Sequence, residues 1–325
     1  MRSIPALSAD LTAAVAGLLP RPMVLTAGRR LGDLTSLLAR KRRSIALKNL
    51  LLALGRELTE AQQRRIMRQS FRQLGQNVLE SFLLPGMLAS GLERYAEIEG
   101  WHHLQEAVAA GRGAIVFTGH FGNWELVALA QGARGIPMDV VGRPLGDRHL
   151  NRRLERMRQL TGNGVISKHD AFRPMLKSLR NGRTVGLVID QNVGGGHGVF
   201  VDFFGRKAST TPALALLALK TGVSVLPVFG YPEGRRHRIV YGPPVSIHRT
   251  GGQKEDVLRL TAAVTRIIED QVRLHPHLWL WMHNRWRSRP DHENQGGASD
   301  PSSFSRRLQP DGLDPTTRHS SPSHS

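Results

Sequence analysis

Short runs rich in β-branched residues alternate with helical segments through the middle of the chain. The strand candidates between residues 95 and 242 are GAIVFTGH, MDVVGR, GVIS, RTVGLVID, GVSVLPVFG and HRIVYG. Between them, apolar residues follow helical spacing at residues 124–133, 148–160, 172–180 and 212–220. Strands joined through a helix pair in parallel, because the helix carries the chain back across the sheet. The alternation therefore predicts an α/β fold with a mainly parallel central sheet flanked by helices.

An amphipathic helical region is predicted before this core. Apolar residues recur every three or four positions from Leu11 to about Pro85, and the basic cluster Arg40–Arg43 lies among them. Such a cluster suits an anchor on an anionic bilayer, and it equally suits a solvated helix face. We expect three regions: a helical, membrane-associating region at 1–90, an α/β core at 91–290 and a disordered tail at 291–325, which is poor in apolar residues.

No segment of the sequence is expected to cross a membrane. A spanning helix needs about 20 apolar residues, and the best candidate, residues 11–28, is interrupted by Pro20, Arg21 and Pro22. The same segment has no basic start, long apolar middle or small-residue cleavage site, which predicts a chain that faces the cytosol.

The net charge of the chain limits the kinds of partner that it is expected to bind. A formal charge of +19 favours nucleic acid, an acidic lipid surface or an acidic carrier protein. A nucleic-acid-binding protein is the alternative from another class, but helix-turn-helix, zinc-finger and aromatic–basic RNA motifs are missing from the sequence. The sequence contains no cysteine, which excludes disulfides, thiolate metal sites and a cysteine nucleophile. We expect neither nucleic acid, metal nor cofactor to bind.

His120 is the residue with the clearest potential for chemistry. It is the last residue of the strand candidate GAIVFTGH, at the edge where α/β sheets place working residues, and Glu125 follows five positions later. A carboxylate bonded to one ring nitrogen fixes the tautomer and leaves the other nitrogen as a base. With no serine or cysteine beside it, the pair suits deprotonation of a substrate hydroxyl. A helix-capping or packing role for His120 is the alternative.

The segment GHFGNWE at residues 119–125 resembles the H-x4-[DE] motif of glycerolipid acyltransferases, in the form found in the lipid A biosynthesis acyltransferase family. Further segments similar to that family follow in the same order. They are GRP at 142–144, LRNGRTVGLVIDQN ending at Asn192, GVFVDFFGRKASTTPALALLA and HPHLWLWMHNRW. The N-terminal LARKRRSIALKNLLLAL and FRQLGQNVLESF are similar as well, so the resemblance covers roughly residues 10–290.

The resemblance implies that the protein moves a fatty acyl chain from an acyl carrier protein or coenzyme A thioester to a hydroxyl of a lipid A precursor or related glycolipid. It implies peripheral or monotopic attachment to the cytoplasmic face of the bacterial inner membrane. His120 would be the general base, with Glu125 as its orienting partner. The match also assigns residues to substrate binding: Asn123, Arg143, Asp190 and Gln191.

Several alternatives stay open at this point. The acceptor could be another lipid, such as a mannosylated or amino-acid lipid, because such enzymes share the fold. A catalytically silent membrane scaffold is a third class, against which the presence of both His120 and Glu125 argues. For the donor we favour the carrier protein, because its many acidic charges would respond to the +19 charge of the chain. Trp279, Trp281 and Trp286 fit either a lipid interface or internal packing.

Overall fold

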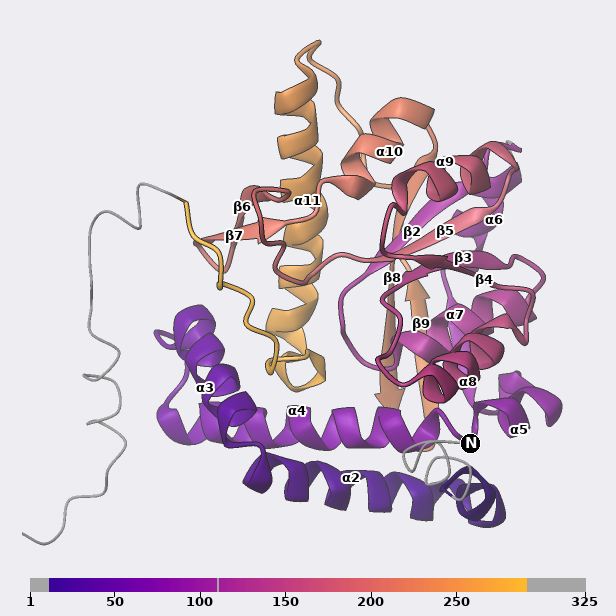
Figure 1. Ribbon diagram of the computed structural model, residues 1–325, viewed down its shortest axis with the longest axis vertical. Helices are drawn as coiled ribbons and strands as arrows, with labels where there is room; N and C mark the ends of the chain where they lie inside the picture. The colour runs from indigo at the N-terminus through magenta and orange to yellow at the C-terminus, as the bar shows by residue number, and fades with distance from the viewer. Residues whose placement is uncertain (1–11, 110, 291–325) are drawn as a thin grey trace, which may run out of the picture. The chain divides into compact units, whose positions relative to one another are not determined.

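The computed structural model describes residues 12–109 and 111–290, and its described residues up to Ser288 form one compact unit. A seven-stranded sheet runs through this unit in the order β1-β9-β8-β2-β5-β3-β4 (Figure 1). The strands are β1 (Ala96–Glu99), β2 (Ala114–Thr118), β3 (Met138–Gly142), β4 (Gly164–Ser167), β5 (Thr184–Val188), β8 (Ser224–Glu233) and β9 (Arg236–Tyr241). Every neighbouring pair is parallel except β8 with β9. The predicted α/β fold with a mainly parallel sheet is therefore confirmed.

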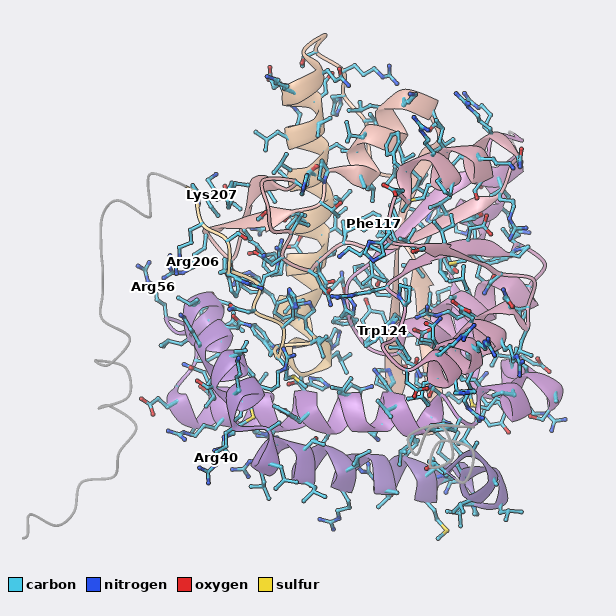
Figure 2. All side chains as sticks on the ribbon, viewed as in Figure 1. Arg40, Arg56, Phe117, Trp124, Arg206 and Lys207 are labelled. Carbon is cyan, nitrogen blue, oxygen red and sulfur yellow. The ribbon has the colours of Figure 1, made fainter. Side chains whose placement is uncertain are left out.

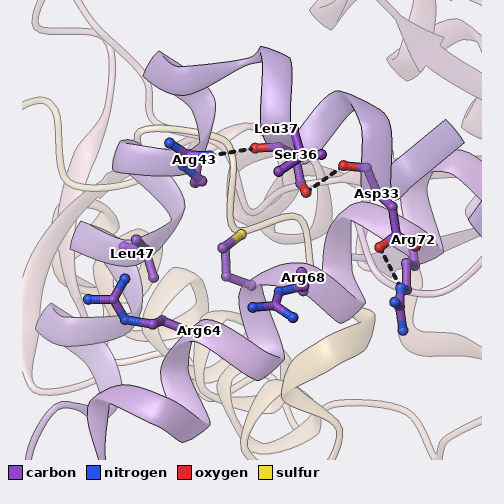
Figure 3. Close-up of a pocket in the computed structure, with 9 residues that line it drawn as sticks. Asp33, Ser36, Leu37, Arg43, Leu47, Arg64, Arg68 and Arg72 are labelled. Atoms are coloured by element: carbon purple, nitrogen blue, oxygen red, sulfur yellow. Dashed lines mark hydrogen bonds and ion pairs between the residues drawn. The ribbon is translucent and has the colours of Figure 1, made fainter. Parts of the chain in front are cut away.

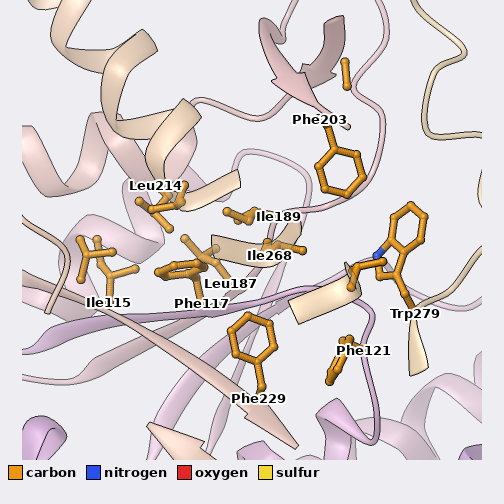
Figure 4. Close-up of a cluster of buried hydrophobic side chains, with 14 of the residues drawn as sticks. Ile115, Phe117, Phe121, Leu187, Ile189, Phe203, Leu214, Phe229, Ile268 and Trp279 are labelled. Atoms are coloured by element: carbon orange, nitrogen blue, oxygen red, sulfur yellow. The ribbon is translucent and has the colours of Figure 1, made fainter. Parts of the chain in front are cut away.

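Helices cover both faces of the sheet. They are α6 (Trp101–Ala109), α7 (Trp124–Ala133), α8 (Arg148–Gln159), α9 (Phe172–Arg180), α10 (Ala213–Thr221) and α11 (Gln253–Leu274). On the central strand β2, Ile115 and Phe117 join a core cluster with α9, α10 and α11, part of which Figure 4 shows. Ala114 and Val116 join a second cluster with α6 and α7. Burial on both faces explains why β2 reads as a continuous apolar run.

The six strand candidates correspond to β2, β3, β4, β5, β8 and β9. The structure adds the short strand β1 and an antiparallel hairpin of β6 (Val199–Phe203) and β7 (Arg206–Thr210), which the sequence pattern missed. Phe204 and Gly205 join the hairpin with φ values of 55° and 67°. A two-residue turn with two positive φ values matches the twist of the strands that it connects.

The N-terminal region is helical, as predicted. It contains α2 (Arg21–Leu38), α3 (Arg40–Leu54), α4 (Glu60–Glu80) and the short α5 (Leu84–Ala89). Among the described residues, the helices are all too short or too polar to cross a membrane. The division into three regions stays a prediction, and its tail at 291–325 lies outside the described residues.

Helices α2 and α4 lie side by side and touch through their backbones (Figure 1). A Cβ atom on Gly75 would lie 2.2 Å from the carbonyl oxygen of Gly28, and one on Gly32 would lie 2.4 Å from that of Phe71. Only glycine permits such an approach, because any side chain would force the helices apart. An ion pair of 2.6 Å between Arg72 and Asp33 bridges the two helices beside this seam.

Candidate active site

His120 and Asp190 meet at the carboxyl ends of two neighbouring parallel strands. Thr118 of β2 pairs with Val188 of β5, and each of the two functional residues follows its strand by two positions. The carboxyl edge of a parallel sheet is where open α/β folds place their reacting groups. Two loops of ordinary length therefore bring together residues that are 70 positions apart in the sequence.

The carboxylate of Asp190 is held by three hydrogen bonds. Nδ1 of His120 lies 2.7 Å from Oδ1, and Oδ2 accepts the backbone N–H of His120 and the indole N–H of Trp279, both at 2.7 Å. Burial raises the pKa of Asp190, but the charge and hydrogen bonds of His120, with the bond from Trp279, outweigh this and lower the pKa to about 2. An ionised carboxylate only accepts hydrogen bonds, so Nδ1 carries a proton, and in the neutral form of the imidazole the lone pair is on Nε2.

The other ring nitrogen of His120, Nε2, belongs to a side chain that is only partly buried. The His120 side chain is 21% exposed, whereas that of Asp190 is 3% exposed. The side-chain amide of Gln191 lies 3.2 Å from Nε2, where its N–H can donate to the lone pair. His120 thus has one nitrogen fixed by a buried acid and a second nitrogen that can reach a substrate. This arrangement can act as a general base.

Glu125 does not take the place that the sequence predicted for it. Its carboxylate receives two hydrogen bonds from Arg158 on α8, of 2.9 Å and 2.6 Å, while Asp190 occupies Nδ1 of His120. The expected His120–Glu125 hydrogen bond is therefore corrected to His120–Asp190. The reason is that α7 begins at Trp124, so Glu125 lies in its first turn and contacts α8. A catalytic part for Glu125 stays a prediction.

The other predicted binding residues lie in different settings. Gln191 lies at the imidazole, as described above. The amide of Asn123 is buried, where it caps α7 through the backbone N–H of Leu126 at 3.1 Å and donates to Glu80 at 2.8 Å. Arg143 follows β3 on the same edge of the sheet and its side chain is exposed. The structure thus brings Asp190 and Gln191 to His120, gives Asn123 a supporting position and leaves Arg143 open to solvent.

A buried network under the His120 turn was missed from the sequence. Glu80 at the end of α4 receives hydrogen bonds from Arg21 at 2.8 Å and Asn123 at 2.8 Å, and lies 3.0 Å from Nε2 of His237 on β9. Burial raises the pKa of Glu80, but the bonds and charges of His237 and Arg21 lower it to about 2. One signal was present in the sequence, because Gln73, Asn77 and Glu80 repeat with the spacing of a buried helix face.

Contacts to the backbone of the turn restrict its conformation. The amide of Asn77 donates to the carbonyl of Gly122, and a Cβ atom on Gly122 would lie 1.8 Å from the carbonyl oxygen of Gly230. Gly122 also has a φ of 53°, so a side chain is excluded for two reasons. The turn therefore has little freedom, and it holds His120 in one place.

Three tryptophans near the end of the described residues are part of the core that supports the site. Trp279, Trp281 and Trp286 are between 0% and 5% exposed, which settles their role as internal packing. Trp279 forms an isolated β-bridge with Phe121, next to His120, and Figure 4 shows both rings in the core. The indole that bonds Asp190 is thereby fixed at both its ring and its backbone.

Known proteins that are similar to this chain over most of its length are lipid acyltransferases. The family model of bacterial lipid A biosynthesis acyltransferases matches residues 10–288. A lipid A biosynthesis lauroyltransferase of Escherichia coli (strain K12) is 26% identical over 280 residues, which cover 84% of this chain and 88% of that protein. A lipid A biosynthesis palmitoleoyltransferase of the same strain is 26% identical over 275 residues, covering 84% and 87%.

Other relatives are named for a different lipid, phosphatidylinositol mannoside. A phosphatidylinositol mannoside acyltransferase of Mycobacterium tuberculosis (strain CDC 1551 / Oshkosh) is 31% identical over 229 residues, covering 68% of this chain and 70% of that protein. With a family model that spans nearly all of the described residues, the chain belongs to the family of bacterial lipid A biosynthesis acyltransferases.

Proposed function

We propose that the protein transfers a fatty acyl chain from a thioester to a hydroxyl group of a lipid A precursor or a related glycolipid. Membership of the family supports transferase chemistry. The observation that carries the proposal is the 2.7 Å bond between Nδ1 of His120 and the buried, ionised Asp190, which leaves Nε2 as the base. No nucleophilic side chain is needed, because the acceptor hydroxyl attacks by itself once it is deprotonated.

In the proposed reaction, Nε2 of His120 accepts the proton of the acceptor hydroxyl as its oxygen attacks the thioester carbonyl carbon. The carbonyl oxygen becomes an oxyanion, and the new C–O bond forms. Collapse of this intermediate breaks the C–S bond, and the leaving thiolate takes the proton back from Nε2. The negative charge of Asp190 stabilises the imidazolium that exists between the two proton transfers.

Gln191 fits a positioning role in this sequence of steps. Its amide lies 3.2 Å from Nε2, at the place that the acceptor hydroxyl needs. Displacement by the acceptor would free the amide to donate a hydrogen bond to the developing oxyanion. Arg143, exposed on the same edge of the sheet, is suited to a phosphate of the donor or acceptor.

For the donor, an acyl carrier protein fits the surface beside the site. Helix α8 carries Arg148, Arg152 and Arg156 at four-residue intervals, all exposed. Residues at this spacing share one helix face, so the helix presents a row of positive charge next to the Glu125–Arg158 pair. A row of this kind complements an acidic protein helix better than it complements the few phosphates of coenzyme A.

The N-terminal helices support attachment to the cytoplasmic face of the bacterial inner membrane. Leu34, Leu37 and Leu38 on α2 are each more than half exposed, and Arg40 on the following helix points outward (Figure 2). An exposed apolar face beside basic residues suits the interface of an anionic bilayer. We propose a peripheral or monotopic attachment through these helices.

The test is an acyl-transfer assay on the purified chain, with mass spectrometry of the lipid product. Acyl carrier protein and coenzyme A thioesters of several chain lengths are each combined with a lipid A precursor and with a mannosylated phosphatidylinositol. We expect a mass increase of one acyl group on the lipid A precursor. Acylation of the mannoside alone would show that the mannoside, and not the lipid A precursor, is the acceptor. Transfer to neither glycolipid would contradict the proposal, provided that an active relative transfers the acyl chain in the same assay.

A further inference from the structure

Helices α2, α3 and α4 together line a groove. Its volume is about 650 Å³. The lining consists of basic, apolar and small polar side chains, nine of which are drawn in Figure 3: Asp33, Ser36, Leu37, Arg43, Leu47, Arg64, Met67, Arg68 and Arg72. His120, Asp190, Gln191 and Trp279 do not belong to this lining. The groove is thus lined by other residues than the proposed acyl-transfer site.

The charge of the lining is strongly unbalanced. Four arginines face a single acid, Asp33, whose carboxylate is already paired with Arg72 at 2.6 Å. Arg64 reaches only the exposed Glu60, at 3.5 Å, and Arg43 donates to the carbonyl of Ser36 at 3.3 Å. No acid of the lining remains for Arg43, Arg64 and Arg68. Unscreened guanidinium groups that converge on a groove favour an anion.

The apolar part of the lining points to a lipid rather than to a free anion. Leu37, Leu47 and Met67 supply the apolar part of the lining, and Met67 is buried. Thirteen large apolar side chains are exposed in the described part of the chain, and nine of these lie between residues 15 and 78. The groove therefore belongs to the region that carries most of the exposed apolar side chains among the described residues, as a headgroup site at a bilayer would.

We propose that this groove binds the phosphate of a single anionic phospholipid. Arg43, Arg64 and Arg68 surround the phosphate, and the first acyl carbons lie against Leu37, Leu47 and Met67. Guanidinium groups bind phosphate oxygens in pairs of parallel hydrogen bonds, which gives such a site specificity that a diffuse basic surface lacks. The site would fix the depth and orientation of the N-terminal helices in the bilayer, independently of the reaction at His120.

The test uses a short-chain lipid that stays monomeric, so that binding to a site is separated from attraction to a charged membrane. Dihexanoyl phosphatidylglycerol is titrated into the full chain carrying ¹³C-methyl methionine, and the signal of Met67 is assigned with Met67→Leu. We expect a saturable, one-to-one shift of Met67. Dihexanoyl phosphatidylcholine, which has no net charge, and glycerol 3-phosphate, which has no acyl chain, should each bind at least about tenfold more weakly.

A pair of double variants tests the arginines. Arg64→Ser with Arg68→Ser should weaken lipid binding about tenfold or more, because charge-assisted hydrogen bonds to the phosphate are lost. Arg40→Ser with Lys41→Ser removes the same charge from exposed positions outside the lining and should leave the Met67 titration unchanged.

Four results would overturn the proposal. The first is a Met67 signal that does not respond to the lipid, and the second is an equal loss of lipid affinity in both double variants. The third is binding of glycerol 3-phosphate that is as tight as binding of the lipid. The fourth is displacement of the lipid by acyl carrier protein, observed at the Met67 signal. The third result would indicate a site for a soluble anion, and the fourth a docking surface for a protein. None of these measurements uses acyl transfer, so their outcome is separate from that of the proposed reaction.

Discussion

Two buried carboxylates in the described part of the chain each lie against a histidine, and the two pairs differ in the exposure of that histidine. Asp190 and Glu80 both have a pKa lowered to about 2, and each lies within 3.0 Å of a ring nitrogen. The His120 side chain is 21% exposed, whereas that of His237 is 3% exposed and its Nδ1 has no partner among the described residues. The exposure of His120 makes the first pair suitable for chemistry, while the second pair connects helices to the sheet.

The largest expected effect separates these two histidines. His120→Ala should lower acyl transfer by about 10⁴-fold, the upper end of the range for a general base, with the free energy of unfolding nearly unchanged. His237→Ala should instead lower the free energy of unfolding by about 1–3 kcal/mol, because a buried hydrogen bond to a charged group is lost. Turnover and urea unfolding are measured on both variants. Near-normal turnover by a folded His120→Ala protein would contradict the assignment of the chemistry to the His120–Asp190 pair.

Asp190→Asn should reduce kcat by about 10²- to 10³-fold. The asparagine amide can donate to Nδ1 of His120, which would move the imidazole proton to Nε2 and remove the base. The readout beyond activity is the tautomer of His120, obtained from ¹⁵N chemical shifts. Loss of activity with the proton still on Nδ1 would show that Asp190 acts by another route.

Glu80→Gln tests the second pair through acid stability. The pKa of Glu80 falls from 4.5 to about 2 on folding, so the ionised form stabilises the fold at pH values above about 4.5. That contribution, about 3 kcal/mol, is lost as the pH falls from about 4.5 towards 2. The variant should be less stable by roughly this amount at pH 7, and its stability should decline less steeply in that window. Glu60→Gln, on an 84% exposed side chain of the same helix, is the control and should change little.

The pair of Glu125 and Arg158 offers a third comparison. Glu125→Ala and Arg158→Ala should each lower kcat/KM, by about tenfold if the pair only positions α7 and α8 around the substrate. Because the two side chains act as one unit, the double variant should lose little more than either single variant. If Glu125→Ala alone costs 10²-fold or more and Arg158→Ala does not, Glu125 has a direct part in catalysis, as the sequence motif implied.

The smallest effect concerns the donor. Arg148→Ser with Arg152→Ser should raise KM for acyl carrier protein and reduce the dependence of kcat/KM on ionic strength, since two surface charges no longer steer the partner. The same variant should hardly change the reaction of a coenzyme A thioester of equal chain length. Equal salt slopes for the two donors in the wild-type protein would remove the argument for a carrier protein.

The sheet and its carboxyl edge could be predicted because they follow from local patterns. Each of the six recognised strands is a short run that contains β-branched residues, and His120 lies two positions after the end of β2. The partner of His120 could not be derived in this way. Asp190 follows β5, 70 positions away, and only the parallel pairing of β2 with β5 brings it to the imidazole. Spacing within one segment favoured Glu125 because it lies close in sequence.

The Glu80 network was missed for a similar reason. It joins Arg21, Glu80, Asn123 and His237, which lie on four separate elements, and no local pattern relates them. A charged residue at a helix end is usually exposed, so Glu80 carries no sign of burial when it is read alone. Its place is visible only once α2, α4, α7 and β9 are packed together.

The long-range hydrogen bonds of Glu80 and Asp190 determine when the site can form during synthesis. The chain leaves the ribosome from its N-terminus, so His120 emerges well before Asp190, His237 and Trp279. The ion pair of Arg21 with Glu80 can form early, but the bond of Glu80 to His237 needs a residue that is synthesised 157 positions after Glu80, and the indole bond to Asp190 needs one that is synthesised 89 positions after Asp190. The base is therefore completed only after Trp279 has been synthesised, and shortened products that stop before Trp279 lack one of the three hydrogen bonds that hold its acid.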